Sequence, residues 1–317
     1  MSDYFRDYEQ LLKILPEYEE FKKGLEILDK FDFSKSSRED IYNKFYDYAY
    51  SLATNFGYLY PENFNKRKFY RVRLNIDRKK EDLSLIQTYS YPPPIFCKEN
   101  GRANLSGKSV FYCSNEPTPA LFECKAKVGD EGFLSVWKGN TNRKIKVGHY
   151  LPSDLRPDNA WSKMAIESFV DLQKHIPEKL KYKLKHIEAL KDFLAKKLIS
   201  EKEPYHLTSM LCWELFYGQI LTDLIIYSSV LTNSRFCNMA IHPNTVNENL
   251  RFEKVIIFKV IDIKNEIPIF NLRTEVGHWN NSKIEWKELT ELIQTTNIQQ
   301  TICYVRKISD FQAAQIL

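Results

Sequence analysis

The spacing of apolar residues predicts a helical start to the chain. Apolar residues recur every three to four positions from Phe21 to Leu28, as on one face of a helix. Ser37 and Asp40 then form a capping-box pattern ahead of a second apolar series. No Gly or Pro interrupts this series before Phe56, so we predict two helices in this region.

The pattern becomes extended after a polar stretch at residues 61–68. Apolar and charged residues alternate over residues 69–74, which predicts a half-buried strand. A second strand is predicted at residues 109–114, and two prolines introduce a short helix over residues 118–127. The proline run at residues 92–94 predicts an extended segment that leads into a polar loop.

Helical spacing returns over residues 157–219, where an apolar stripe is flanked by many lysines. We interpret these lysines as a solvated helix face in preference to a surface for an acidic partner. Helices at the front and in the middle of the chain, with strands on both sides of the middle helices, predict an α+β fold. The further strands are predicted at residues 224–230, 255–263, 267–272 and 301–305.

The composition disfavours sites in which bare backbone cradles a phosphate. The chain has 317 residues with an ordinary globular balance, but only 10 of them are Gly. The segment from Gly101 to Ser109 resembles a P-loop at first sight. It has five residues between its glycines where a P-loop has four, and the predicted strand follows it, so we reject this motif.

Charge, cysteine and histidine patterns predict a cytoplasmic protein without a metal. The net charge of +5 is too slight to predict a nucleic-acid surface. No stretch is apolar enough for a membrane span, and the first residues lack the pattern of a signal peptide. The six cysteines are scattered as free thiols would be in a reducing compartment, and the six histidines never pair at metal-ligand spacing.

The segment around Glu123 is the most informative part of the sequence. A polar loop leads into a strand that ends near Tyr112, and the next helix carries one acid among apolar neighbours. Such an acid is costly to bury unless the protein uses it. The order of motifs here resembles the RES-domain family, named for its Arg, Glu and Ser. Its pieces in this chain are Tyr70-Arg71, Pro92-Pro93-Pro94, Gly101-Arg102-Ala103-Asn104, Tyr112-Cys113-Ser114, Ala120-Leu121-Phe122-Glu123, Ile226-Tyr227-Ser228-Ser229 and Asn238.

The resemblance covers about half of the chain and implies a fold. It spans residues 69–242, and each motif is weak alone, so the order of the motifs carries the resemblance. The implied core is a mixed β-sheet similar to that of ADP-ribosyltransferases. We therefore predict a helical N-terminal region at residues 1–65 and a catalytic domain at residues 66–317 that contains a helical insertion.

The resemblance also implies a function. Members of the RES family act as toxins that consume NAD by hydrolysis or phosphorolysis, and a helix-turn-helix antitoxin commonly holds them inactive. NAD is then a substrate, and no metal is expected. Two alternatives are kept. The protein transfers ADP-ribose to a protein acceptor, or it is a non-catalytic module that binds a partner through its N-terminal arm or its lysine-rich helix.

Three residues are the implied catalytic group. Glu123 would stabilise the oxocarbenium-like state that forms when the nicotinamide bond of NAD breaks. Arg71 offers a planar fork suited to the pyrophosphate, and Tyr112 would stack on the nicotinamide or its ribose. The structural alternatives are a core position for Tyr112 and an internal ion pair between Arg71 and Glu123.

Two further residues are implied in NAD binding. Arg102 would assist at the pyrophosphate, with a loop-surface role as an equal alternative. Ser229 would hydrogen-bond the ribose or the carboxamide, or else satisfy a neighbouring backbone group. The sequence leaves two choices open, between Ser229 and Ser228 and between Arg71 and Arg73, which lies on the same strand face.

Overall fold

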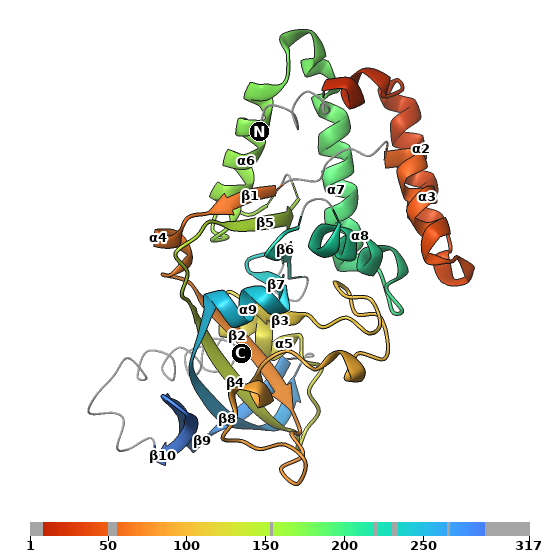
Figure 1. Ribbon diagram of the computed structural model, residues 1–317. Helices are drawn as coiled ribbons and strands as arrows, with labels where there is room; N and C mark the ends of the chain where they lie inside the picture. The colour runs from red at the N-terminus through yellow and green to blue at the C-terminus, as the bar shows by residue number, and fades with distance from the viewer. Residues whose placement is uncertain are drawn as a thin grey trace. The chain divides into compact units, whose positions relative to one another are not determined.

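The computed structural model describes residues 9–49, 56–152, 155–218, 221–229, 234–264 and 267–288 (Figure 1). These residues form helices and a mixed set of strands, which confirms the α+β class. The chain divides into two compact units. Unit 1 comprises Met1–Tyr60, Pro92–Val110 and Arg143–Pro243, and unit 2 comprises Pro61–Tyr91, Phe111–Asn142 and Asn244–Leu317. The predicted boundary near residue 65 lies close to the first crossing between the units, and the chain crosses between them four more times.

The helices of unit 1 include the two that were predicted near the start of the chain. The capping box is present, because the Asp40 amide donates to Ser37 Oγ at 3.1 Å and the Ser37 amide donates to Asp40 Oδ2 at 3.0 Å. The helices and short 3-10 turns are α2 (Tyr18–Lys30), η1 (Phe33–Lys35), α3 (Arg38–Ala49), η3 (Pro94–Phe96), α6 (Ser162–His175), η4 (Glu178–Lys183), α7 (Leu184–Ser200) and α8 (His206–Tyr217).

Four strands of unit 1 pair in the order β1-β5-β6-β7. The pair β5–β6 is parallel, and the other two pairs are antiparallel. The predicted helical series does not reach Phe56, because Phe56 already belongs to a strand and pairs with Gly148. The strands are β1 (Phe56–Leu59), β5 (Ile145–Tyr150), β6 (Leu224–Ser228) and β7 (Cys237–Ile241).

The lysine-rich segment of unit 1 holds the N-terminal helix. The Lys183 ammonium is buried and donates to the backbone carbonyl of Pro16 at 3.0 Å. The ammonium of Lys197 donates to the carbonyl of Asp29 at 2.7 Å, and that of Lys196 pairs with the Asp29 carboxylate. The prediction of a solvated lysine face is therefore wrong for Lys183 and Lys197, which are buried or nearly so and donate to backbone carbonyls, whereas Lys196 is exposed.

Unit 2 contains six antiparallel strands in the order β3-β2-β4-β8-β9-β10 (Figure 1). The strands predicted at residues 69–74, 109–114, 255–263 and 267–272 are all present, and the one at 301–305 lies outside the described residues. The elements are α4 (Pro61–Phe64), β2 (Lys68–Leu74), η2 (Ile86–Tyr89), β3 (Phe111–Ser114), α5 (Pro117–Phe122), β4 (Glu131–Gly139), α9 (Pro243–Asn249), β8 (Leu250–Lys264), β9 (Ile267–Asn280) and β10 (Lys283–Glu288).

The sheet of unit 2 is covered differently on its two faces. On one face, Ala120 and Leu121 of α5 pack with Tyr70, Leu134 and Val136 in a buried apolar cluster. Side chains that alternate with these along β2 and β4 point to the other face. There the buried ring of Tyr89, the last residue of η2, packs against Phe133 and Phe252, and Phe252 packs against Trp137.

Candidate functional site

Arg71 is held in place by two backbone carbonyls of unit 2. Its Nε–H donates to the carbonyl of Ser90 at 3.1 Å, and Nη1 donates to the carbonyl of Tyr112 at 2.9 Å. The guanidinium carbon lies 5.5 Å from the centre of the Phe111 ring. The half-buried Arg71 side chain therefore links β2 to β3 and to the segment that follows η2.

Arg73, the alternative on the same strand face, has a carboxylate partner. Its Nη1 lies 2.6 Å from Glu81 Oε2, and its Nη2 lies 3.1 Å from Oε1 of the same residue. It also donates to the carbonyl of Thr88. Glu81 therefore neutralises Arg73, and the choice between Arg71 and Arg73 stays open.

Tyr112 lies on the face of β3 that α5 covers. Tyr70 of β2 pairs with Ser114, and Tyr112 is two residues away on the same face of the strand. The side chain of Tyr112 is half-buried. Its backbone carbonyl accepts the hydrogen bond from Arg71, so the position of this tyrosine depends on that arginine.

Glu123 is exposed, which corrects the expectation of a buried acid. Helix α5 turns Ala120 and Leu121 toward the sheet and ends at Phe122, so that Glu123 is the residue that caps the helix. Its amide donates to the carbonyl of Pro119 at 2.9 Å. The Glu123 side chain therefore lies at the surface of unit 2.

Arg71 and Glu123 approach the sheet of unit 2 from different faces. Neighbouring residues of a strand point in opposite directions, and α5 packs on the face that carries Tyr70 and Val72. Arg71 points to the other face, where its partner Ser90 lies. Tyr112 and the end of α5 that carries Glu123 thus lie on the same face of the sheet. Arg71 lies on the other face and contacts Tyr112 only through its hydrogen bond to the Tyr112 carbonyl among the contacts described above.

Arg102 caps a helix in unit 1. It donates to the carbonyl of Leu198 in the last turn of α7, and to the carbonyl of Glu201 at 3.4 Å. Its guanidinium carbon also lies 4.8 Å from the centre of the Tyr205 ring. A cation at a helix C-terminus satisfies carbonyls that have no partner within the helix, so these contacts support a structural role.

Ser229 and Ser228 are both buried at the end of β6 in unit 1. The Ser229 amide donates to the carbonyl of Phe236 at 3.1 Å, and its carbonyl accepts from the Ser234 amide at 3.1 Å. The Ser228 hydroxyl is buried without a hydrogen-bond partner among the described residues. Backbone bonds therefore fix Ser229, and the choice between the two serines stays open.

Burial suppresses the ionisation of two thiols and one histidine. Burial raises the pKa of Cys113 well above its ordinary range, and it raises the pKa of Cys124 to about 11. Burial lowers the pKa of His149 to about 3, and its Nε2 lies 2.7 Å from Ser168 Oγ. Within the described residues, no group of His, Cys, Asp and Glu side chains could hold a metal ion.

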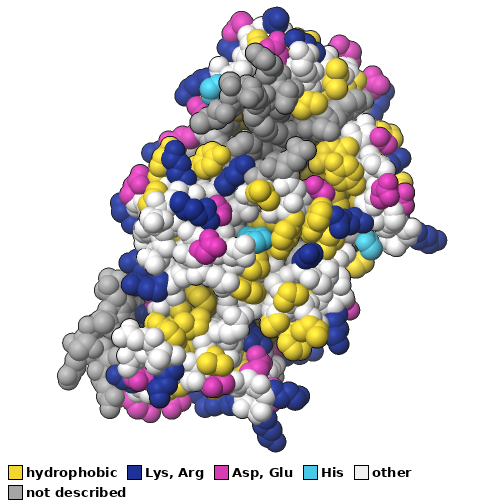
Figure 2. Space-filling view, in the orientation of Figure 1, with side chains coloured by type: hydrophobic (Ala, Val, Ile, Leu, Met, Phe, Trp, Pro, Cys, Tyr) yellow, Lys and Arg dark blue, Asp and Glu magenta, His cyan; other side chains and the backbone are white. Residues whose placement is uncertain are grey.

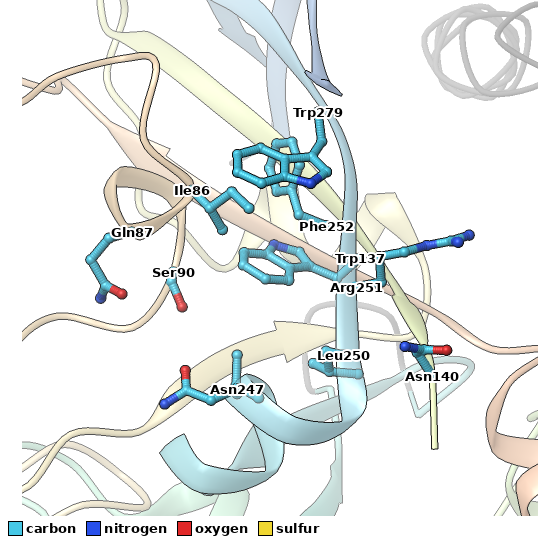
Figure 3. Close-up of a pocket in the computed structure, with 11 residues that line it drawn as sticks. Ile86, Gln87, Ser90, Trp137, Asn140, Asn247, Leu250, Arg251, Phe252 and Trp279 are labelled. Atoms are coloured by element: carbon cyan, nitrogen blue, oxygen red, sulfur yellow. The ribbon is translucent and has the colours of Figure 1, made fainter. Parts of the chain in front are cut away.

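A pocket of about 320 Å³ lies on the face of unit 2 opposite to α5 (Figure 3). It is lined by Ile86, Gln87, Ser90, Trp137, Asn140, Val246, Asn247, Leu250, Arg251, Phe252 and Trp279. Sequence patterns missed it, because these residues come from separate segments and meet only through the register of the sheet. The aromatic content of the chain was its one signal.

Comparisons with known proteins leave the family open. No family model matches the chain, and no protein of curated function matches it significantly. Among the described helices, none combines the length and the apolar character that a membrane crossing requires. On the face seen in Figure 2, Lys and Arg side chains are interspersed with Asp and Glu.

Proposed function

We propose that the protein is a RES-type enzyme that cleaves the bond between nicotinamide and ribose in NAD. The observation that carries the proposal is that Tyr112 and the helix that ends at Glu123 lie on one face of the sheet of unit 2, while Arg71 binds the backbone of Tyr112 from the other face. Arg71, Tyr112 and Glu123 lie in β2, in β3 and at the end of the helix that follows β3. Since β2 pairs with β3 and α5 packs against β2, segments separate in sequence become neighbours.

The exposed carboxylate of Glu123 suits this chemistry. When the glycosidic bond breaks, its electron pair leaves with nicotinamide, and positive charge develops on the ribose. A carboxylate beside the ribose stabilises that charge, and the loss of one such preorganised group typically costs on the order of 10²–10³ in rate. Tyr112 shares a face of the sheet with α5, and its ring is a candidate to pack against nicotinamide or ribose.

Arg71 contributes by holding Tyr112. Two of its N–H groups already bind the carbonyls of Ser90 and Tyr112, which orient the guanidinium plane. Contact between Arg71 and the pyrophosphate stays a prediction. Arg102 and Ser229 belong to unit 1 and have structural contacts of their own, so neither is needed for the central claim.

The acceptor decides the products. With water, NAD gives ADP-ribose, nicotinamide and a proton. With inorganic phosphate it gives ADP-ribose phosphate, and with a protein acceptor the ADP-ribose stays on that protein. Nicotinamide is released in all three cases, so its release reports bond cleavage independently of the acceptor.

The test incubates purified full-length protein with NAD in plain buffer, with phosphate, and with cell extract. We expect nicotinamide release in at least one of the three, and Glu123→Gln should reduce it at least about 100-fold. Glu26→Gln is the matched control, because Glu26 is an exposed glutamate on α2 with no described hydrogen bond or ion pair. A Glu123→Gln variant that unfolds at the wild-type temperature and retains full activity would refute the role of Glu123.

The proposal extends to a cytoplasmic toxin that a helix-turn-helix antitoxin holds inactive. An active NAD-consuming enzyme should stop cell growth when it is produced alone, whereas the Glu123→Gln variant should permit growth. Equal toxicity of the two proteins would contradict the link between toxicity and NAD cleavage.

A further inference from the structure

One end of the sheet of unit 2 carries a row of cations. Lys68 of β2, Lys138 of β4 and Arg251 of β8 lie directly opposite one another on three neighbouring strands. Opposite residues of antiparallel strands share one face of the sheet, and their Cβ atoms are about 5 Å apart. Like charges in this position repel one another, so the row lowers the stability of the sheet in the absence of a counter-charge.

Lys254 and His278 extend this row toward the interior of unit 2. The two residues are opposite each other on β8 and β9, and Lys254 is only 6% exposed. Among the described residues, no hydrogen bond or ion pair reaches the Lys254 ammonium. His278 Nε2 is buried and has no hydrogen-bond partner in the described part of the chain either. Two neighbouring nitrogen groups therefore lack the partner that buried polar groups normally have. The row, Lys254 and His278 together form the cation cluster.

Electrostatic effects show that the members of the cation cluster are close to one another. Burial lowers the pKa of Lys254 to about 8, and repulsion from Lys68 contributes to this shift. Burial also lowers the pKa of His278, with contributions from Lys254 and from Lys287 of β10. Cationic groups from separate strands thus converge on one place, where each makes it harder for the others to hold a proton.

The carboxylates nearby do not neutralise the cation cluster. Glu253 lies 4.0 Å from both Lys68 and Arg251, at the limit of an ion pair. Glu285 lies opposite His278 on β10 and already accepts a hydrogen bond from an asparagine amide. The lysines and the arginine of the cluster outnumber these two carboxylates, so the cluster keeps a net positive charge.

The cation cluster is distinct from the two sites described above. Helix α5 packs on the same face of the sheet, against residues that follow Lys68 along β2. The Arg251 guanidinium points away from Gln87 and Ser90 in Figure 3, and so away from the pocket on the opposite face. None of the residues implied in NAD binding belongs to the cluster, so a ligand here does not depend on NAD cleavage.

We propose that the cation cluster binds the dianionic phosphate group of a small ligand, either inorganic phosphate or a phosphate monoester. The phosphate oxygens would supply the acceptor that the Lys254 ammonium lacks, and the negative charge would offset the repulsion within the row. A phosphate group carries a charge of about −1.5 to −2 at pH 7 and offers several acceptor oxygens. A carboxylate fits less well, because its single charge would neutralise fewer of these cations.

Inorganic phosphate and glycerol 3-phosphate are the probes for this proposal, with chloride at equal ionic strength as the reference. Binding is measured at pH 7 by thermal unfolding and by isothermal titration calorimetry. A ligand that binds only the folded protein raises the unfolding temperature. We expect at least one phosphate probe to raise it saturably, whereas chloride should leave it unchanged. The probe that binds more tightly identifies the source of the phosphate group.

Three variants complete the test. Lys254→Met should weaken phosphate binding at least about tenfold, since it removes the buried ammonium. Arg251→Gln should weaken it about threefold or more, and Arg251 is exposed, so folding does not depend on its charge. Lys259→Met removes the same charge from an exposed position of β8 and should leave binding unchanged.

Three results would overturn the proposal. The first is stabilisation by chloride that equals stabilisation by both phosphate probes. The second is a loss of phosphate binding in Lys259→Met as large as that in Lys254→Met. The third is an oligonucleotide without a terminal phosphate that binds more tightly than both probes, because an extended polyanion would then be the ligand.

Discussion

Lys254 provides a direct test of the packing in unit 2. It lies on β8 opposite Val136 of β4 and His278 of β9, and it is only 6% exposed. No hydrogen bond or ion pair to it is found among the described residues. Burial, with a smaller contribution from the neighbouring Lys68, lowers its pKa from 10.5 to about 8, and Glu253 opposes this shift.

The sign and size of the effect follow from this lowered pKa. Between about pH 8 and 10.5 the unfolded chain binds a proton that the folded protein releases, so the contribution of Lys254 to stability rises with pH in that window. Below about pH 8 the folded protein carries the full penalty, which is on the order of 3 kcal/mol. Lys254→Met removes the charge while keeping a side chain of similar length.

The assay is urea unfolding of wild type and Lys254→Met from pH 6 to 10. We expect the variant to be more stable by about 2–3 kcal/mol at pH 7, with an advantage that shrinks above pH 8. Lys259→Met is the control, because Lys259 is exposed on the same strand and should show a difference within about 0.5 kcal/mol. A stability difference that does not change with pH, or a destabilised Lys254→Met protein at pH 7, would refute the reasoning.

Three further predictions concern packing, capping and reactivity. Gly132→Ala should lower the free energy of unfolding by about 1–3 kcal/mol, because a Cβ there would lie 1.9 Å from the buried ring of Phe258. A free energy of unfolding in urea equal to that of the wild type would contradict this close approach. Ser37→Ala should cost about 1 kcal/mol in the same assay, since it removes the hydroxyl that caps the Asp40 amide, and a neutral result would mean that the cap is dispensable. Alkylation of Cys124, followed by mass spectrometry, should rise with a midpoint near its pKa of about 11, and a midpoint near the ordinary 8.5 would contradict its burial.

Short-range sequence patterns were sufficient to predict helices and strands that bury only one face. The capping box at Ser37 and the alternation along β2 are short-range signals, and both are present in the structure. The central strand β4 was missed because residues 132–137 are all buried, so no apolar–polar alternation marks it. Such a strand can be identified only from the strands that it pairs with, and the sequence does not show which strands are neighbours in the sheet.

The exposure of Glu123 could not be predicted from the sequence. The motif order brought Tyr112 and Glu123 to one region, but Glu123 follows the last turn of α5 and is exposed. Helix α5 ends at Phe122, whereas a helix was predicted over residues 118–127. Because Glu123 follows the last residue of the helix, the helical pattern did not predict its exposure. Arg102 and Lys183 illustrate the same limit, because each binds carbonyls nearly 100 residues or more away in the chain.

Release of nicotinamide from NAD by the purified protein tests the central claim most directly. The claim predicts release by wild type in at least one of water, phosphate or cell extract, and at least about 100-fold slower release by Glu123→Gln. The absence of nicotinamide release with every acceptor, from protein that is folded by thermal unfolding, would contradict it.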